Sequence, residues 1–401
     1  MGSYIPSTRE ERLAMLESIG MHSFDELYAD IPEALRLKDG LSLPSGLSEL
    51  EVAQKIEEIA GKNTRFSHIF RGAGSYQHYI PAIVKQVTSK EEFVTAYTPY
   101  QAEISQGLLQ SIFEYQTMIC ELTGMDVSNA SVYDGATAAA EAAAMCRDRK
   151  RGIICVSASV DPKILSVIRT YCFGSGAPLV VLLEKEGLTD LESWNSMDTS
   201  SIACLIIQTP NYYGLVEDGA DISLGEGQPL GLPMGFGGPY LGFMASTKDM
   251  MRKLPGRIVG QTTDVDGKRA YVLTLQAREQ HIRRQKATSN ICSNQSLMAL
   301  FVTVYMAVMG KKGVKEAGEL SYAGAHYMMD KLVETGHFKP TFQKPFFNEF
   351  CVEYDGDVDV LQKKFVDNGF LGGVKMGDHT IMFAVTEQRS KEEIDNLIKL
   401  I

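Results

Sequence analysis

The fold is decided by three short apolar segments, GIICV at 152–156, LVVLL at 179–183 and ACLIIQ at 203–208. Each has the length and composition of a buried strand, and helical stretches separate the earlier ones. An alanine-rich helix precedes them, beginning at Asp134 and ending near Cys146. Because strands that alternate with helices form parallel sheets covered on both faces, the pattern predicts an α/β fold with a mainly parallel sheet.

Toward the C-terminus the pattern first continues and then changes. We expect a further strand at Tyr240–Ala245. A helix from Asn294 to Met309 is apolar nearly all round, which predicts that it is buried. After Gly313 a second helix leads into a smaller α+β unit. The expected elements of that unit are strand Glu349–Tyr354, helix Val358–Asn368, strand Thr380–Thr386 and helix Lys391–Ile401.

The N-terminal residues have the pattern of a helical arm. Ser7 with Glu10, and Ser48 with Glu51, are capping-box pairs that predict the starts of two amphipathic helices. We therefore predict three domains: a helical arm at 1–65, a large α/β domain at 66–312 and a small α+β domain at 313–401.

One connection is short for this fold. Only 12 residues, Thr209 to Ala220, lie between the strand at 203–208 and the segment 221–224. A parallel crossover usually needs about a dozen residues or more, and normally a helix. Either the segment 221–224 is not the next parallel strand, or a helix–strand unit is absent.

Composition narrows the classes of function. The net charge of −11 argues against nucleic-acid and anionic-membrane partners, since both require a basic face. No apolar run approaches the roughly 20 residues of a membrane span, and the N-terminus lacks a secretory pattern. Seven dispersed cysteines without a CxxC pair predict reduced thiols in a cytoplasmic protein. The seven histidines show no metal-binding spacing, so we expect no metal site.

Three stretches are candidates for ligand binding. Asp134-Gly135-Ala136-Thr137 at a helix start could hold a phosphate, although plain N-capping by Asp134 would explain it as well. The glycine-rich Gly225–Gly238 loop could approach a ligand or a neighbouring subunit, or simply form a tight turn. Arg278–Asn290 carries several basic residues and could contact a phosphate or carboxylate, or be a solvated helix end.

These stretches resemble the P-protein family of the glycine cleavage system, in the subunit 1 (alpha) type that occurs where the enzyme is split in two. The resemblance covers nearly the whole chain. The matching stretches are Gly72–Pro81, Thr95–Gly107, Val132–Thr137, Gly225–Gly242, Pro255–Gly260 and Leu275–Asn294.

The resemblance implies a fold-type-I, PLP-dependent transferase architecture, similar to aspartate aminotransferase, in which paired subunits build active sites at their interface. It also implies the reaction, in which glycine is decarboxylated on PLP and the aminomethyl group passes to the lipoyl group of the H-protein. The implied partners are a beta subunit in an alpha2beta2 heterotetramer, the lipoylated H-protein and glycine.

The resemblance further implies that this chain is not the half that holds PLP. In the PLP-binding half, a His-Lys-Thr tripeptide precedes a loop similar to Leu232–Pro239. Aligning the two loops puts the Schiff-base lysine at Gln228. An amide cannot form an imine, and no lysine lies between Lys185 and Lys248. We therefore expect no catalytic residue in this chain and a vestigial phosphate site at Asp134, Gly135, Ala136 and Thr137.

The short Thr209–Ala220 connection supports the same conclusion. Family members usually carry a helix and a strand here, a unit on the order of 30 residues. In related PLP enzymes the corresponding strand bears the Asp that pairs with the pyridine nitrogen. The resemblance therefore implies that this chain anchors the cofactor poorly.

By position, Lys286, Thr288, Ser289 and Asn290 are the candidates for contacts to the PLP of the beta subunit. The Gly72–His78 loop is a second candidate, for lining the entrance used by glycine or the lipoyl arm. Two alternatives stay open. The chain could be a stand-alone PLP enzyme that uses another lysine, or a non-catalytic scaffold or regulatory protein with the same fold.

Overall fold

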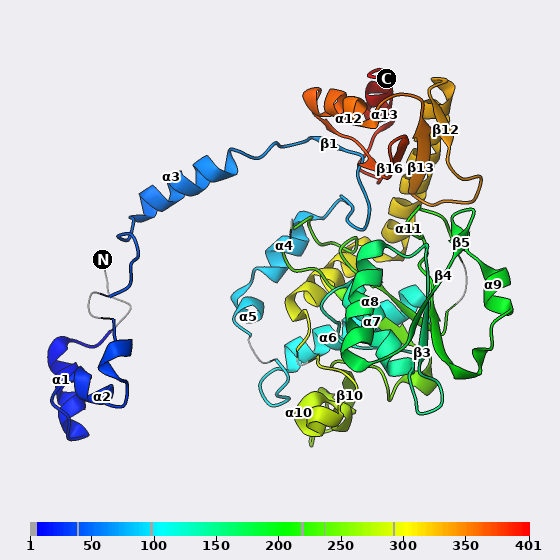
Figure 1. Cartoon of the computed structure of the whole chain (residues 1–401). Coiled ribbons are helices and arrows are strands. Elements are labelled where there is room, and N and C mark those ends of the chain that lie inside the picture. The colour runs from blue at the N-terminus through cyan, green and yellow to red at the C-terminus, as the bar shows by residue number, and fades with distance from the viewer. Residues whose placement is uncertain (1–5, 38–39, 97–98, 218–219, 236, 292) are drawn as a thin grey trace. The chain divides into compact units, whose positions relative to one another are not determined.

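The computed structural model describes residues 6–37, 40–96, 99–217, 220–235, 237–291 and 293–401 (Figure 1). The chain forms two compact units, Met1–Thr64 and Arg65–Ile401. The three predicted domains, with boundaries after residues 65 and 312, stay predictions.

The N-terminal unit consists of short helices. They are α1 (Arg9–Ser18), α2 (Phe24–Leu27), the 3-10 helix η1 (Glu33–Leu35) and α3 (Glu49–Ala60). The predicted capping box of α3 is confirmed, because Ser48 and Glu51 each accept a hydrogen bond from the other's backbone N–H. The sequence places the box of α1 one residue too early. Thr8 and Glu11 form it instead of Ser7 and Glu10, since two overlapping pairs fit the same motif.

The second unit alternates helices and strands in its first part. The elements are β1 (His68–Ile69), α4 (Ala82–Thr88), α5 (Glu91–Val94), α6 (Gln106–Thr123), β2 (Val127–Ser128), α7 (Gly135–Cys146), β3 (Ile153–Ser157), α8 (Pro162–Ser175), β4 (Leu179–Leu182), β5 (Glu184–Lys185), β6 (Leu188–Thr189), α9 (Leu191–Asn195), η2 (Thr199–Ser201), β7 (Ile202–Ile206), β8 (Ile222–Glu226) and β9 (Gly242–Ser246). The predicted strands at 152–156, 179–183 and 203–208 and the strand expected at Tyr240–Ala245 are all present, with shifted ends.

The strands of this part form two three-stranded sheets. β3 pairs in parallel with β4 on one side and with β7 on the other, as the βαβ pattern predicts. β9 pairs antiparallel with β2 and β8, so the second sheet has the order β2-β9-β8. Within the described part of the chain, no backbone pairing joins β7 to β8. The segment 221–224 is therefore not the next parallel strand beside β7.

Helix α7 packs against both sheets. Its Ala139, Ala140 and Ala143 lie in a core cluster with side chains of β3 and β7. Residues further along α7, including Met145, lie in a second cluster with Met244 of β9 and side chains of β8. Small alanine side chains let the helix approach both sheets closely, so α7 connects two sheets between which the described residues form no backbone pairing.

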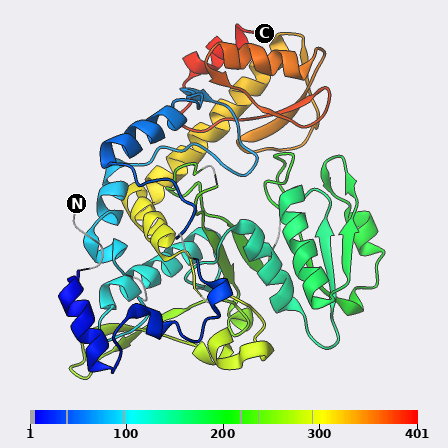
Figure 2. The ribbon, with the colours of Figure 1, turned by 60° about the vertical axis from the view of Figure 1, so that its left-hand side comes forward.

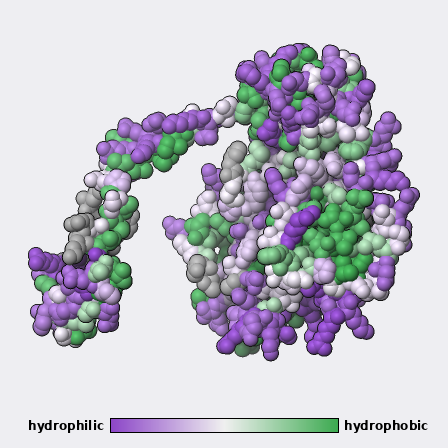
Figure 3. All heavy atoms as spheres, in the orientation of Figure 1, coloured by the Kyte–Doolittle hydropathy of each residue, from purple (hydrophilic) through white to green (hydrophobic). Residues whose placement is uncertain are grey.

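One side of the parallel sheet is poorly covered. Four of the five residues of β3 are buried, but only Leu182 in β4 and only Ile202 in β7 are buried. Hydrophobic residues gather on the face of the molecule that carries α8, β3 and β4 (Figure 3). Parallel sheets normally have helices on both faces, so this exposure is unusual for the architecture.

The remaining elements form a connecting region and a C-terminal sheet. They are η3 (Lys248–Met250), β10 (Val259–Thr263), β11 (Arg269–Leu273), η4 (Gln276–Arg278), α10 (Gln280–Arg283), η5 (Arg284–Lys286), α11 (Ser296–Glu334), β12 (Phe338–Pro340), β13 (Glu349–Tyr354), α12 (Val358–Asp367), β14 (Phe370–Leu371), β15 (Val374–Lys375), β16 (Thr380–Ala384) and α13 (Lys391–Ile398). The antiparallel order β12-β13-β16-β15 matches the predicted α+β unit.

Helix α11 links the two parts of this unit (Figure 2). Its first half packs with α6 and β9 through Val302 and Tyr305, and its second half packs under the C-terminal sheet through Met328 and Leu332. Between the halves, Gly310 has φ 61° and ψ 176°, which breaks the helix. The sequence predicts these halves as two separate helices.

By length and composition alone, α11 could cross a membrane, with a mean hydropathy of 1.4 over its most apolar stretch. The expectation that no apolar run approaches the length of a membrane span misses this stretch. The core helix of a folded domain passes the same test, and α11 supplies buried side chains to two cores.

The close approach of α7 predicts a strong effect of side-chain size. We expect Ala140→Leu, at a fully buried position, to lower the free energy of unfolding by about 1–3 kcal/mol because the added carbons have no space. Ala144→Leu, on the half-buried side of the same helix, is the control and should change it by less. Urea unfolding measures both, and equal effects would show that α7 is not closely packed.

Candidate functional site

The site begins at the N-terminus of α7. Asp134 is the N-cap, and its side-chain Oδ1 accepts a hydrogen bond of 2.7 Å from the N–H of Thr137. The helix thus starts where the sequence predicts. The next free donor, the N–H of Gly135, does not face an open anion site. It donates to Oε2 of Glu226 at 3.1 Å.

The carboxyl group of Glu226 fills this helix end. Besides the N–H of Gly135, it accepts hydrogen bonds from the N–H groups of Gln228 at 3.1 Å and Leu241 at 3.2 Å. Burial raises the pKa of Glu226, and these three donors oppose that shift. A helix N-terminus attracts negative charge, and here the chain supplies an acidic group of its own.

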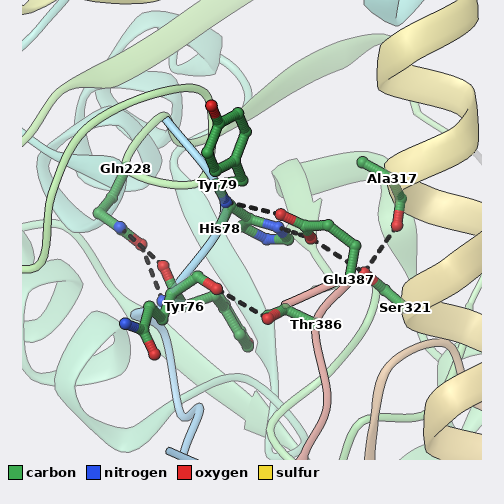
Figure 4. A network of polar contacts seen from close by, with 9 residues as sticks. Tyr76, His78, Tyr79, Gln228, Ala317, Ser321, Thr386 and Glu387 are labelled. Carbon is green, nitrogen blue, oxygen red and sulfur yellow. Dashed lines mark hydrogen bonds and ion pairs between the residues drawn. The ribbon is translucent and has the colours of Figure 1, made fainter. Parts of the chain in front are cut away.

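Two residues further on, Gln228 is only 1% exposed, and Figure 4 shows its amide hydrogen-bonded to the backbone of Tyr76. Its Oε1 accepts from the N–H of Tyr76 at 2.8 Å. Its Nε2 donates to the carbonyl oxygens of Tyr76 at 2.9 Å and Leu232 at 2.8 Å. Both amide protons are therefore used, and Gln228 joins the glycine-rich loop to the Gly72–His78 loop.

The Gly72–His78 loop is also held by residues that follow the last strand, β16. Thr386 donates to the carbonyl oxygen of Gln77 at 2.7 Å. Glu387 accepts from the N–H of Tyr79 and contacts Nδ1 of His78, each at 2.6 Å (Figure 4). Although burial raises the pKa of Glu387, the hydrogen bonds from His78 and Tyr79 bring it below the usual value.

A buried carboxyl group, Glu349 of β13, supports the start of this loop. It accepts a hydrogen bond of 3.2 Å from the N–H of Ala73, and its side chain is hydrogen-bonded to Tyr76. Burial raises the pKa of Glu349 to about 7. Burial, together with the nearby Glu349, also raises the pKa of Tyr76.

The predicted residues Lys286, Thr288, Ser289 and Asn290 lie at a different place. Lys286, Thr288 and Asn290 are exposed, as a contact to a partner subunit would require, while Ser289 is half-buried and hydrogen-bonded to Glu141 of α7. Among the described residues, no hydrogen bond or ion pair joins these four residues to Gln228 or to the Asp134–Thr137 helix start.

Glu226 connects the Asp134–Thr137 helix start to Gln228, and the roles predicted for these two positions stay predictions. Glu226 could have been noticed, because it stands between two glycines only two residues before Gln228. Glu349 and Glu387 are far from the loop in the sequence, and no local pattern marks them.

Neither thiols nor metal ligands define a second site in the part that the structure describes. Six cysteines are free, and Cys292, which the sequence analysis also predicts to be reduced, lies outside the described residues. No group of three His, Cys, Asp or Glu side chains among the described residues could hold a metal ion.

Comparison with known proteins shows the family of the chain. The family model described as glycine cleavage system P-protein matches residues 2–219 and 216–401. The chain belongs to this family. A relative from Moorella thermoacetica, named probable glycine dehydrogenase (decarboxylating) subunit 1, is 46% identical over 436 residues, which cover 99% of this chain and 98% of the relative.

Solved structures agree with this assignment. A crystal structure of glycine decarboxylase (P-protein) of the glycine cleavage system, in inhibitor-bound form, has a TM-score of 0.91 and 37% identity, covering 100% of this chain and 99% of that chain. Lactobacillus brevis glutamate decarboxylase shares the fold alone, with a TM-score of 0.65 and 12% identity over 94% of this chain and 95% of that chain. The predicted fold-type-I PLP-dependent architecture is confirmed.

The alignment also bears on the short connection. It spans 436 positions, 35 more than the 401 residues of this chain. The two matches to the P-protein family model meet at residues 216–219, inside the Thr209–Ala220 connection and between β7 and β8. A missing helix–strand unit would account for both observations, and it stays a prediction.

The residues of this P-protein chain do not fit PLP. Position 228 carries a fully bonded amide where the resemblance requires a lysine amine. At the helix start that the resemblance assigns to the cofactor phosphate, the N–H of Gly135 already donates to Glu226. A phosphate at the same N–H group would have to displace a buried carboxyl group with three backbone donors.

We expect that Gln228→Lys does not convert the chain into a PLP enzyme. The variant should be about 1–3 kcal/mol less stable, because Tyr76 and Leu232 lose buried hydrogen-bond partners. Urea unfolding and the absorbance of a covalent PLP adduct are the measurements, with the exposed Gln101→Lys as control. A stable adduct at residue 228 would contradict this account.

The raised pKa of Glu349 predicts a pH-dependent stability. Between pH 4.5 and about 7 the unfolded chain loses the Glu349 proton while the folded chain keeps it, so the free energy of unfolding falls as the pH rises. The loss attributable to Glu349 is about 3 kcal/mol. Glu349→Gln should abolish this decrease in the free energy of unfolding. Glu353→Gln, at an exposed position of the same strand, should leave the decrease unchanged. Urea unfolding at pH 5 and pH 7.5 measures the free energy of unfolding of each variant. The prediction is contradicted if both variants show the same pH dependence.

Proposed function

We propose that this chain is the alpha subunit of the glycine cleavage system P-protein, the half without the PLP lysine. Together with a beta subunit it decarboxylates glycine on the PLP of that subunit. The aminomethyl group then passes to the lipoyl group of the H-protein. The name subunit 1, carried by the Moorella relative, supports a partner subunit, and we propose an alpha2beta2 heterotetramer in the cytoplasm.

Two side chains of this chain occupy positions that the resemblance assigns to the cofactor, and this observation carries the proposal. The amide of Gln228 bonds to Tyr76 and Leu232, and the carboxyl group of Glu226 bonds to the start of α7. A chain that has filled both positions with its own side chains gains an activity only through a partner.

Our candidate for that contribution is the segment that holds the exposed Lys286, Thr288 and Asn290 and the half-buried Ser289. An ammonium group and a hydroxyl group on a surface segment can donate hydrogen bonds to a phosphate held by another subunit. The Gly72–His78 loop is fixed at Tyr76, Gln77 and His78, so it offers a rigid wall for a substrate or lipoyl entrance.

The first test is assembly and activity. We expect glycine–CO2 exchange from a mixture of this chain and the beta subunit, and none from this chain alone, because only beta carries the imine-forming lysine. Activity of this chain alone would support a stand-alone PLP enzyme instead. A mixture that binds but stays inactive would support a scaffold or regulatory protein.

The second test concerns the proposed contact. Lys286→Ala with Thr288→Ala should weaken the PLP affinity of the assembled enzyme about tenfold or more, because charge-assisted hydrogen bonds are lost. Lys339→Ala, an exposed lysine of β12, is the control. PLP dissociation is followed by cofactor absorbance after dilution. Unchanged affinity in the double variant rules out this contact.

A further inference from the structure

A cavity of about 150 Å³ lies between the segment after β9 and the segment before α11. One wall contains Arg252 and Lys253, and the other contains Arg278 and Arg283. The hydroxyl-bearing residues Thr288 and Ser289 also line it. Four basic residues therefore converge on one small cavity in a chain whose net charge is −11.

Within the described residues these positive charges have no ion-pair partner, although the carboxylate of Glu279 acts electrostatically on Arg278. In the described part of the chain, no salt bridge involves Arg252, Lys253, Arg278 or Arg283. The one carboxylate in the lining, Glu279, is buried and forms an ion pair with Arg257. Its charge is therefore shared with Arg257, a residue outside the lining.

Arg278 is the most constrained of the four. Its Nη2 donates a 2.7 Å hydrogen bond to the carbonyl oxygen of Gly256, which fixes the guanidinium at the cavity wall. Its Nε is buried without a partner, and burial lowers the pKa of the group. The neighbouring Glu279 offsets part of the cost of holding this guanidinium partly out of water, and a bound anion would offset more of it.

The size and the donors of the cavity indicate the class of anion. Its volume corresponds to about five waters, the scale of a group of four oxygens. Guanidinium groups match the oxygens of phosphate with paired N–H donors, and the hydroxyl group of Thr288 adds a further donor. A single carboxylate would leave several of these charges uncompensated.

We propose that this cavity is a binding site for a phosphoryl dianion. Because Thr288 and Ser289 belong both to the cavity and to the segment assigned above to the partner's cofactor, the proposal deepens the proposed function and rests on it for the source of the phosphoryl group. That source is either the phosphate of the cofactor held by the beta subunit or free inorganic phosphate.

The test uses the full chain and inorganic phosphate. Isothermal titration at low ionic strength should show one saturable site that weakens as salt is added. Arg278→Gln should weaken binding about tenfold or more, since it removes a charge-assisted donor. The double variant Arg252→Gln, Lys253→Gln changes only exposed residues and should weaken binding similarly, so the test does not depend on Arg278→Gln folding.

Lys364→Gln, which removes an exposed charge from α12, is the matched control and should bind phosphate like the unchanged chain. The proposal is overturned if phosphate shows no saturable binding. It is also overturned if Lys364→Gln weakens binding as much as the cavity variants, since binding would then reflect overall charge.

A second experiment identifies the source of the phosphoryl group. If the phosphoryl group belongs to the partner's cofactor, adding PLP-loaded beta subunit should release the phosphate from this chain. If the site takes free phosphate, this chain should bind the phosphate and the PLP-loaded beta subunit at the same time. Failure of phosphate binding with intact glycine–CO2 exchange in the mixture would refute the cavity site alone, whereas phosphate binding without exchange would refute only the proposed function.

Discussion

The amide of Gln228 is the interaction on which the rest of the site depends. It bonds to Tyr76 and Leu232 and so joins two loops that lie about 150 positions apart in the chain. Because this amide is buried and bonded to the backbone of both loops, residue 228 has no free donor directed at a cofactor. The neighbouring Glu226 completes the change by occupying the start of α7. The same short segment thereby occupies the positions that the resemblance assigns to the cofactor, and it fixes the loop that contacts the C-terminal sheet.

The unpaired edges of the two three-stranded sheets are a related constraint. β7 and β8 each lack a pairing partner on one edge within the described residues, and α7 is the element that packs against both. Unpaired strand edges and a half-covered parallel sheet favour association with other chains. A subunit that depends on a partner for activity could thus also depend on it for covering apolar surface.

Much of this fold follows from local sequence patterns. The apolar strands, the helix start at Asp134 and the elements after Glu349 are set by residue periodicity and by capping, so they are predictable. The residues that close the site are not, because their contacts are tertiary. Glu349 and Glu387 reach the Gly72–His78 loop from the far end of the chain. The sequence indicates that residue 228 lacks an amine, but only the structure shows what its amide does.

The central claim is that this chain provides no lysine to PLP and that a partner does. The most direct measurement is reduction of the assembled, PLP-loaded enzyme with borohydride, followed by peptide mass mapping of both subunits. The account predicts pyridoxyl-labelled lysine in the beta subunit and in no peptide of this chain. A pyridoxyl group on any lysine of this chain would contradict it.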